Sequence, residues 1–314
     1  MFAPGPCTTP FNVNNRRLLE LANPSAGNLL GSMTQFDDGG TQSYNGLLLN
    51  ATWRKGNAIN LSGNYTWSHC IGFPGTFLTN LSAAYPHQPY QNNGPQDRQL
   101  DYGDCYATAL DIRQVANITM VANTPRMSGG NWASRLASNW TFSTIYTVRT
   151  GPPLTLNTGG DNAENGLYVG AGSYPIPQRP NQVLANTAAP DRGQSCSPAP
   201  CVSYFNSAAF APPTPGTYGN MGVADLRAPG FWEWDQTISR QFRITENQHV
   251  EFRVEAFNVT NSVRFYITPG AGDAAVNLSS GQFGRITSAA STTGSTSPTG
   301  NGGRIMQLAL KYVF

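Results

Sequence analysis

The chain ends with Arg304-Ile-Met-Gln-Leu-Ala-Leu-Lys-Tyr-Val-Phe314, and the assignment of the fold class starts from this stretch. Read with the period of two that a β-strand imposes, one face carries only apolar side chains and the other is mixed. Soluble chains usually end in polar residues, whereas a strand with lipid on its outer side can end on an aromatic side chain at the membrane interface. A strand in a soluble core would alternate too, so the other strands must decide. The apolar face holds Met306, Leu308, Leu310, Tyr312 and Phe314.

The composition favours a large β-structure. Only 11% of the 314 residues are charged, against about 25% in ordinary soluble domains. The 33 glycines and 23 prolines indicate many turns and irregular loops. A net charge of +2 gives no indication of a nucleic-acid partner. No apolar run approaches the ~18 residues of a transmembrane helix, so a membrane-spanning part would have to be made of strands.

Several earlier segments alternate in the same way, and with a strand around Gly27–Phe36 we expect about eight strands. We expect one curved antiparallel sheet, with the apolar side chains on its convex, lipid-facing side. The segment at 231–242 fits least, because Gln236 and Arg240 share the face of Trp232 and Trp234. The alternating segments are 43–55, 58–71, 111–123, 131–150, 231–242 and 248–258. Representative residues of the predicted lipid face are Leu47, Leu61, Ile118, Trp140, Phe252 and Leu308.

Asn-x-Ser/Thr triplets recur inside these segments, beginning at Asn50, Asn60, Asn64, Asn117 and Asn139. Glycosylation acceptors belong in surface loops, and these triplets lie within strands. The alternation explains them more simply, because Asn and Ser/Thr then share the polar face and the apolar residue between them faces lipid. A barrel lumen tolerates such a polar face, but the core of a soluble sandwich does not.

Short and long connections alternate along the chain. They are short after Lys55, Asn123 and Phe242, and long after Ile71, Thr150 and Asn258. Up-and-down membrane barrels have short periplasmic turns and longer extracellular loops, an arrangement that places Phe314 at the periplasmic end. The sequence therefore predicts an all-β, antiparallel up-and-down transmembrane β-barrel in the outer membrane of a Gram-negative bacterium, with long extracellular loops.

The five cysteines form no Cys-x-x-Cys pair, and with three histidines in the chain we expect neither a metal site nor a cofactor. Cys196 and Cys201 bracket a loop-like Ser-Pro-Ala-Pro and are predicted to form a disulfide, which implies an oxidising compartment. Cys70 and Cys105 lie at the two ends of one predicted outer loop and are a second candidate pair. Cys7 is left over.

The first residues, Met1-Phe-Ala-Pro-Gly-Pro-Cys, contain neither a basic region nor an apolar run, and they do not resemble a signal peptide. An exported protein needs such a signal. The expectation is therefore that the protein is either not exported or that this sequence is part of something longer.

With these segments placed, the chain resembles the C-terminal part of TonB-dependent outer-membrane transporters of the Oar-like group. The residues that carry the resemblance cover nearly the whole chain in order. They are Tyr44-Asn-Gly-Leu, Asn64-Tyr-Thr-Trp-Ser68, Phe205-Asn-Ser-Ala-Ala-Phe210, Gly216-Thr-Tyr-Gly-Asn220, Arg227-Ala-Pro-Gly-Phe-Trp232, Phe252-Arg-Val-Glu-Ala-Phe-Asn-Val-Thr-Asn261, Phe283-Gly-Arg-Ile286 and Leu308–Phe314.

Such transporters are barrels of about 22 strands closed by an N-terminal plug. The resemblance implies that residues 25–314 form the last eight or so strands of such a barrel, and that residues 1–24 continue from an upstream part. It also implies TonB as a partner through a plug that this sequence lacks. A further implication is that the barrel-assembly machinery recognises the final strand, where Leu310, Tyr312 and Phe314 form the apolar face of the assembly signal.

The function that follows is transport of a substrate into the periplasm, without catalysis. A small stand-alone outer-membrane barrel with a structural or surface-binding role is the alternative, and a soluble β-sandwich is disfavoured by the uncharged apolar faces. An outer-membrane hydrolase is a further alternative because polar residues gather near the predicted outer rim, although their spacing is not diagnostic. They are Ser68, His69, His87, Asp101 and Asp104.

The substrate-binding residues cannot be assigned from the sequence, although aromatic residues in the predicted loops could stack on sugars. An oligosaccharide is therefore one candidate substrate. These aromatic residues are Tyr85, Tyr90, Tyr102, Tyr168, Tyr174 and Tyr218.

Overall fold

The fold is given by a computed structural model of the full chain. It describes residues 18–27, 29, 41–72, 102–105, 111–125, 132–163, 178–245, 248–267, 273–289 and 303–314. The helices are α1 (Leu18–Ala22), α2 (Pro24–Gly27) and α3 (Trp132–Ala137), with 3-10 turns η4 (Ser207–Ala209) and η5 (Ala274–Val276). The long strands are β1 (Gln42–Lys55), β2 (Ile59–Gly72), β4 (Gln114–Asn123), β5 (Trp140–Arg149), β11 (Phe231–Arg243), β12 (His249–Phe257) and β16 (Ile305–Val313).

Among the described residues, nine two-residue strands lie in the connections. They are β3 (Gly103–Asp104), β6 (Pro153–Leu154), β7 (Asn181–Gln182), β8 (Val202–Ser203), β9 (Phe210–Ala211), β10 (Leu226–Arg227), β13 (Phe265–Tyr266), β14 (Arg285–Ile286) and β15 (Ser288–Ala289). No helix in the described part of the chain is long and apolar enough to cross a membrane.

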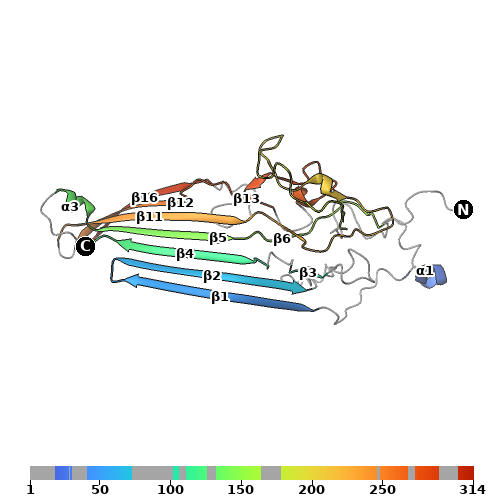
Figure 1. Ribbon diagram of the computed structural model, residues 1–314, viewed down its shortest axis with the longest axis horizontal. Coiled ribbons are helices and arrows are strands. Elements are labelled where there is room, and N and C mark those ends of the chain that lie inside the picture. Colours follow the sequence, from blue (N-terminus) through green and yellow to red (C-terminus); the bar gives the residue numbers. More distant parts are fainter. Residues whose placement is uncertain are drawn as a thin grey trace.

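The long strands form one sheet in the order β1-β2-β4-β5-β11-β12-β16, with β3 added beside β2. Every neighbouring pair is antiparallel, and each long strand lies beside the next long strand along the chain. Figure 1 shows these strands side by side, with α3 and the C-terminus at one end and β3, β6 and β13 at the other. The up-and-down antiparallel arrangement predicted from the sequence is confirmed.

The pairing register places the predicted apolar side chains on one face. One row across the sheet contains Gly63, Ile118, Tyr146 and Trp234, and another contains Trp140, Arg240, Phe252 and Leu310. Residues directly opposite in an antiparallel pair point to the same side, so the apolar face is continuous from β1 to β16. We call this side the lipid face and the other the polar face.

Within the part of the chain that the structure describes, no second layer packs against the lipid face. Leu308 is 72% exposed and Leu310 is 75% exposed, although burying a leucine side chain is worth about 1.5–3 kcal/mol. Ile118 and Phe252 are exposed as well. A soluble sandwich would bury this face, whereas the outer wall of a membrane barrel gives it to lipid.

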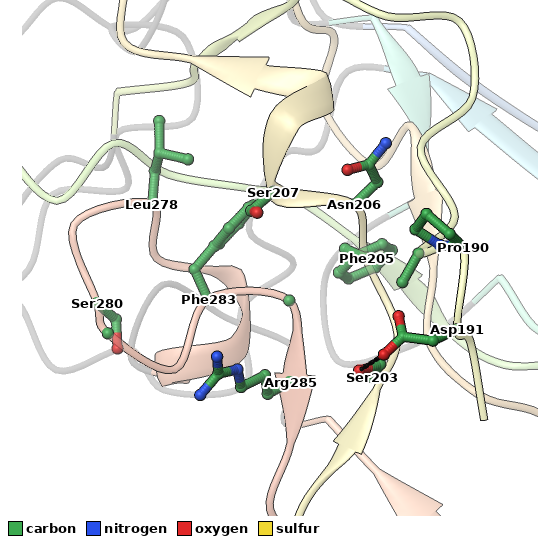
Figure 2. Close-up of a pocket in the computed structure, with 13 residues that line it drawn as sticks. Pro190, Asp191, Ser203, Phe205, Asn206, Ser207, Leu278, Ser280, Phe283 and Arg285 are labelled. Atoms are coloured by element: carbon green, nitrogen blue, oxygen red, sulfur yellow. Dashed lines mark hydrogen bonds between the residues drawn. The ribbon is translucent and has the colours of Figure 1, made fainter. Parts of the chain in front are cut away.

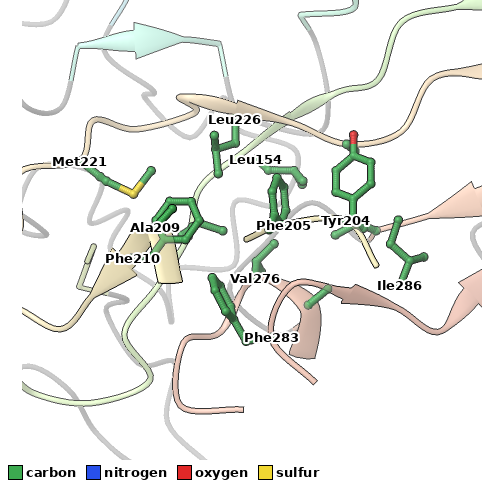
Figure 3. Close-up of a cluster of buried hydrophobic side chains, with 14 residues drawn as sticks. Leu154, Tyr204, Phe205, Ala209, Phe210, Met221, Leu226, Val276, Phe283 and Ile286 are labelled. Carbon is green, nitrogen blue, oxygen red and sulfur yellow. The ribbon is translucent and has the colours of Figure 1, made fainter. Parts of the chain in front are cut away.

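The buried hydrophobic core lies in the connections rather than in the sheet. Its members come from residues 154–286. Figure 3 shows the side chains of Leu154, Phe205, Phe210, Val276 and Phe283 gathered in this cluster. Phe210 and Phe283 meet edge to face with ring centres 5.6 Å apart. We call residues 151–230 and 258–289, so far as they are described, the loop layer.

The loop layer corrects the expectation of one long irregular loop over 151–230. Paired short strands hold it together: β6 with β10, β7 with β9 and β8 with β14. Gly151, at the start of the layer, permits a close approach to the segment before β11, because a Cβ there would overlap the Ala228 carbonyl oxygen. The core residues are scattered without helical or strand period, so alternation alone could not find them.

Two strand boundaries also differ from the sequence prediction. The strand predicted over 131–150 begins only at Trp140, because residues 132–137 form α3, and the connection after β4 is therefore longer than expected. Asn139, at a φ of 60°, separates helix from strand, and asparagine tolerates this left-handed conformation. The strand predicted around Gly27–Phe36 lies mostly outside the described residues, and Gly27 itself ends α2.

Candidate functional site

The polar face of the sheet carries a ladder of side-chain hydrogen bonds between neighbouring strands. Ser62 and Thr119 are joined at 2.9 Å, and Asn117 donates its amide to Asn64 at 3.0 Å. Thr141 donates its hydroxyl to Asn123 at 2.8 Å. These residues belong to the Asn-x-Ser/Thr triplets or lie opposite them, so the shared polar face inferred from the triplets is confirmed.

Charged groups occupy the polar face where β11 and β12 run together. Arg253 lies 2.8 Å from Glu251 and 3.5 Å from Glu255, both on its own strand. Arg264, almost wholly buried, lies 2.7 Å from Glu233 and over the ring of Phe231. Acidic and basic groups of this kind suit a wet lumen and not a lipid surface.

At the end of the sheet that carries the long connections, five titratable residues meet. They are His69, Asp104, Asp111, Arg113 and Arg227, here called the junction cluster. β2, β3 and β10 supply His69, Asp104 and Arg227, and the other two residues immediately precede β4. The cluster therefore joins the strand ends to the base of the loop layer.

Asp111 is the centre of the junction cluster and is fully buried. Its carboxylate accepts from the Cys70 backbone N–H at 2.7 Å, from Arg113 Nε at 2.8 Å and from Arg227 Nη2. Arg227 Nη1 also donates to the Asp111 carbonyl oxygen at 2.5 Å. Each buried acceptor is thus met by a donor, which a buried carboxylate requires.

Asp104 completes the charge balance. It accepts from Arg113 Nη2 at 2.7 Å and from Arg227 Nη2, and His69 Nε2 lies 3.0 Å from it. The two arginines therefore each bridge the two carboxylates. Burial alone would raise the pKa of Asp111, but its hydrogen bonds from Arg227, Cys70 and Arg113 outweigh burial and hold that pKa below its usual value.

The described residues contain two disulfides. Cys70 is bonded to Cys105 and Cys196 to Cys201, with Cα atoms 5.3 Å and 5.2 Å apart, and these are the two pairs named from the sequence. Gln42 donates to both sulfurs of the first pair, at 3.0 Å and 2.8 Å, which brings the start of β1 to the same place. Cys7 lies outside the described residues.

A cavity of about 360 Å³ opens in the loop layer. Figure 2 shows the side chains of Phe205 and Phe283 in its wall, together with Asp191, Ser203 and Arg285. Asp191 accepts from the Ser203 hydroxyl at 2.8 Å, and Arg285 Nη1 donates to the Ser197 carbonyl at 2.9 Å. Arg285 pairs directly with Ser203 across β14 and β8, so the acidic and basic side chains flank the same serine.

The structure brings together only part of the residue set considered for catalysis. His69 and Asp104 are in contact, but the Ser68 hydroxyl donates to the Ile112 carbonyl oxygen at 3.1 Å. Asp101 and His87 lie outside the described residues. Among the aromatic candidates, Tyr102 and Tyr218 are described and Tyr85, Tyr90, Tyr168 and Tyr174 are not. Within the described ranges, no group of three or more His, Cys, Asp or Glu residues could hold a metal ion.

Sequence reasoning missed Asp111, Arg113 and Arg227. Asp111 and Arg113 are separated by one residue just before β4, and Arg227 opens the Arg227-Ala-Pro-Gly-Phe-Trp232 segment quoted above. The available signal was that charged residues are scarce in this chain and that these stand at predicted strand ends. The contact between Arg227 and Asp111 joins residues more than a hundred positions apart in the sequence, and no local spacing reveals it.

The last strand places Leu310 and Tyr312 on the lipid face, opposite Phe252 and Val250 of β12. Phe314 follows the strand and is 90% exposed, with its ring 6.0 Å from that of Tyr312. All three residues lie toward the end of the sheet that carries α3 and the C-terminus in Figure 1.

An open antiparallel sheet with one lipid face, one polar face and its longest connections at one end defines an outer-membrane β-barrel wall. The comparison with protein families agrees, because a family described as the outer membrane beta barrel domain matches residues 2–307. The chain belongs to this family, and its location is the outer membrane of a Gram-negative bacterium. Neither the search of curated proteins nor that of solved structures finds a match.

Proposed function

We propose that this chain forms part of the wall and the outer loop layer of a TonB-dependent transporter, and that residues 25–314 are the C-terminal strands of its barrel. The observation that carries the proposal is the state of the sheet edges. Among the described residues, β1 pairs only with β2, and β16 pairs only with β12. Unpaired backbone groups are not tolerated in lipid, so each edge calls for a further strand.

The polar face supports a transport role. Its ladder of Asn, Ser and Thr side chains and its ion pairs on β11 and β12 suit a hydrated passage that is wider than side chains alone can fill. In the proposed assembly a plug closes this passage, and TonB opens it by acting on the plug. Residues 1–24 continue from the upstream strands. The barrel-assembly machinery would recognise the apolar face of Leu310, Tyr312 and Phe314 through edge-on strand addition.

The loop layer would capture the substrate. Its cavity offers an acceptor in Asp191, donors in Arg285 and hydroxyls in Ser203 and Ser280. Groups that both donate and accept suit an oligosaccharide, which we propose as the substrate class. We propose no catalytic role, because the Ser68 hydroxyl is bonded to a backbone carbonyl and His69 and Asp104 belong to the junction cluster.

A growth experiment tests the transport proposal. Strains with and without the gene, each with active or inactivated TonB, would grow on limiting oligosaccharides as sole carbon source. We expect one substrate on which loss of the gene and loss of TonB give the same defect, with no further defect when both are lost. A gene-dependent growth difference that persists unchanged without TonB would refute the proposal.

The cavity is tested separately in the same strains. Asp191→Asn and Arg285→Gln should raise the substrate concentration for half-maximal uptake and leave the maximal rate unchanged. Asp225→Asn, an exposed acid elsewhere in the loop layer, is the matched control. Equal effects of all three substitutions would remove the cavity from the account while leaving the transport proposal standing.

A further inference from the structure

Arg240 occupies an unusual position, on the lipid face of β11. It pairs with Trp140 of β5 and with Phe252 of β12, both of which point to lipid. Its neighbours two positions away on the same strand, Ile238 and Phe242, share this face. Its neighbours across and along the sheet are thus apolar or aromatic side chains, among which a charge needs an explanation.

The guanidinium of Arg240 lies over two aromatic rings. It is 5.1 Å from the ring centre of Trp140 and 4.7 Å from that of Phe242. Phe242 is two residues nearer the end of β11 that carries the short connection, so the arginine side chain extends toward that end. Both distances are within the range in which an aromatic ring attracts a cation.

Arg240 lies close to the periplasmic interface of the membrane. β11 ends three residues further on, at Arg243, which corresponds to about 10 Å of strand. An outward-facing arginine is most costly at the midplane of the membrane, and this cost becomes small near the interface. Trp140, Phe242, Tyr312 and Phe314 place an aromatic girdle at this level, as expected where lipid headgroups begin.

The lipid face is basic at this end. In the seven long strands, all of which the structure describes, the Lys, Arg, His, Asp or Glu positions on this face are Lys55, His69 and Arg240. Lys55 is the last residue of β1, at the same end as Arg240, whereas His69 belongs to the junction cluster at the opposite end. Acidic residues of β11 and β12 all lie on the polar face. The charge on this part of the lipid face therefore complements an anion.

We propose that Arg240 binds the phosphate of a phospholipid in the periplasmic leaflet of the outer membrane. The planar guanidinium presents paired donors that match two phosphate oxygens. Trp140 and Phe242 hold the guanidinium in place and contact the upper part of the acyl chains. This site faces lipid and is independent of the proposed transport function.

Lipid titration of the full-length protein tests the site. Protein extracted from outer membranes in a neutral detergent is titrated with phosphatidylglycerol, and the bound lipid is counted by native mass spectrometry. Arg240→Gln should weaken the tightest lipid binding about tenfold, the loss of one charge-assisted hydrogen-bonded contact. The lipid affinity of Arg240→Lys should lie between those of the unaltered protein and Arg240→Gln, because lysine keeps the charge but lacks the paired donors of the guanidinium.

Two controls keep the outcome decisive. Arg243→Gln removes the same charge from the polar face three residues away, and it should leave lipid binding unchanged. The unaltered protein should retain phosphatidylglycerol in preference to diacylglycerol, which has the same chains without the phosphate. Equal lipid retention by Arg240→Gln and Arg243→Gln, or equal retention of the two lipids, would overturn the proposal. Displacement of the lipid by inorganic phosphate would also overturn it, because it would identify a site for the free ion.

Discussion

Replacement of Asp111 by alanine should release the loop layer from the sheet while leaving the sheet itself intact. Asp111 is fully buried and accepts hydrogen bonds from Cys70, Arg113 and Arg227. Its removal leaves the Cys70 N–H without an acceptor and leaves two arginines with only Asp104 between them. The contacts that bring β10 against the end of β2 are therefore weakened together.

The expected loss of stability depends on how exposed the two arginine partners of Asp111 are. Removing one member of a fully buried ion pair costs about 3–5 kcal/mol. Here the side chains of Arg227 and Arg113 are 28% and 31% exposed, so water can solvate them after the change and the cost falls to about 2 kcal/mol. Asp111→Asn keeps an acceptor for Cys70 and should cost about half as much.

Hydrogen exchange of individual backbone amides measures this effect. A cost of about 2 kcal/mol corresponds to an increase of about thirtyfold in the opening of the affected segment. The increase should appear at Ala228, whose N–H donates to Pro152, and at Cys105, whose N–H donates to Cys70. The amide of Asn64, in the middle of β2, should not change.

The exposed Asp191 supplies the control. Asp191→Asn removes an acidic charge from the same layer without touching the junction cluster, and it should leave exchange at Ala228 within about twofold of the unaltered protein. Unchanged exchange at Ala228 in Asp111→Ala would refute the reasoning. Equal acceleration throughout the sheet would refute it too, because the cluster would then stabilise the whole fold.

Three further predictions concern the same architecture. Because the pKa of Asp111 is lowered on folding, its stabilisation is present at neutral pH and is lost as the pH falls below about 4; exchange at Ala228 should accelerate there, and a flat profile would contradict the assignment. The Cys70–Cys105 disulfide closes a loop with a separation of 35 residues, and its loss should lower the free energy of unfolding measured in urea by about 4 kcal/mol. Loss of Cys196–Cys201, with a separation of 5, should lower it by about 2 kcal/mol. Equal losses would argue against this chain-entropy reasoning. Phe314→Ala should leave a periplasmic, protease-sensitive pool if the final strand is an assembly signal, and normal insertion kinetics would reduce that residue to an interfacial anchor.

The sheet could be predicted from the sequence because its determinants are local. Alternation with a period of two placed Leu61, Ile118 and Leu308 on one face without any knowledge of their neighbours. The irregular strand was β11, where Gln236 and Arg240 interrupt the apolar face, and the structure keeps both residues on that face. The interruption at Arg240 therefore reflects a feature of the surface rather than an error of register.

The loop layer could not be predicted in the same way. Its core combines residues such as Leu154, Phe210 and Val276, which are far apart in sequence and follow no period. The junction cluster likewise depends on Arg227 reaching Asp111 across the fold. Such contacts are set by tertiary packing, and the local pattern around each residue indicates only a polar or apolar loop. The helix at 132–137 is not predicted either, because its residues directly precede the alternation that begins at Trp140 and are assigned to the same strand.

One face of the sheet is assigned to lipid and the other to water, and a pair of adjacent residues in β4 tests this assignment directly. Spin labels at Asn117→Cys and Ile118→Cys, each in a Cys7→Ser background, would be compared in intact outer membranes by their collision rates with oxygen and with a water-soluble nickel complex. Oxygen concentrates in lipid, so the label at 118 should be relaxed mainly by oxygen and the label at 117 mainly by nickel. The reverse order, or equal access of nickel to both positions, would contradict the membrane-wall assignment.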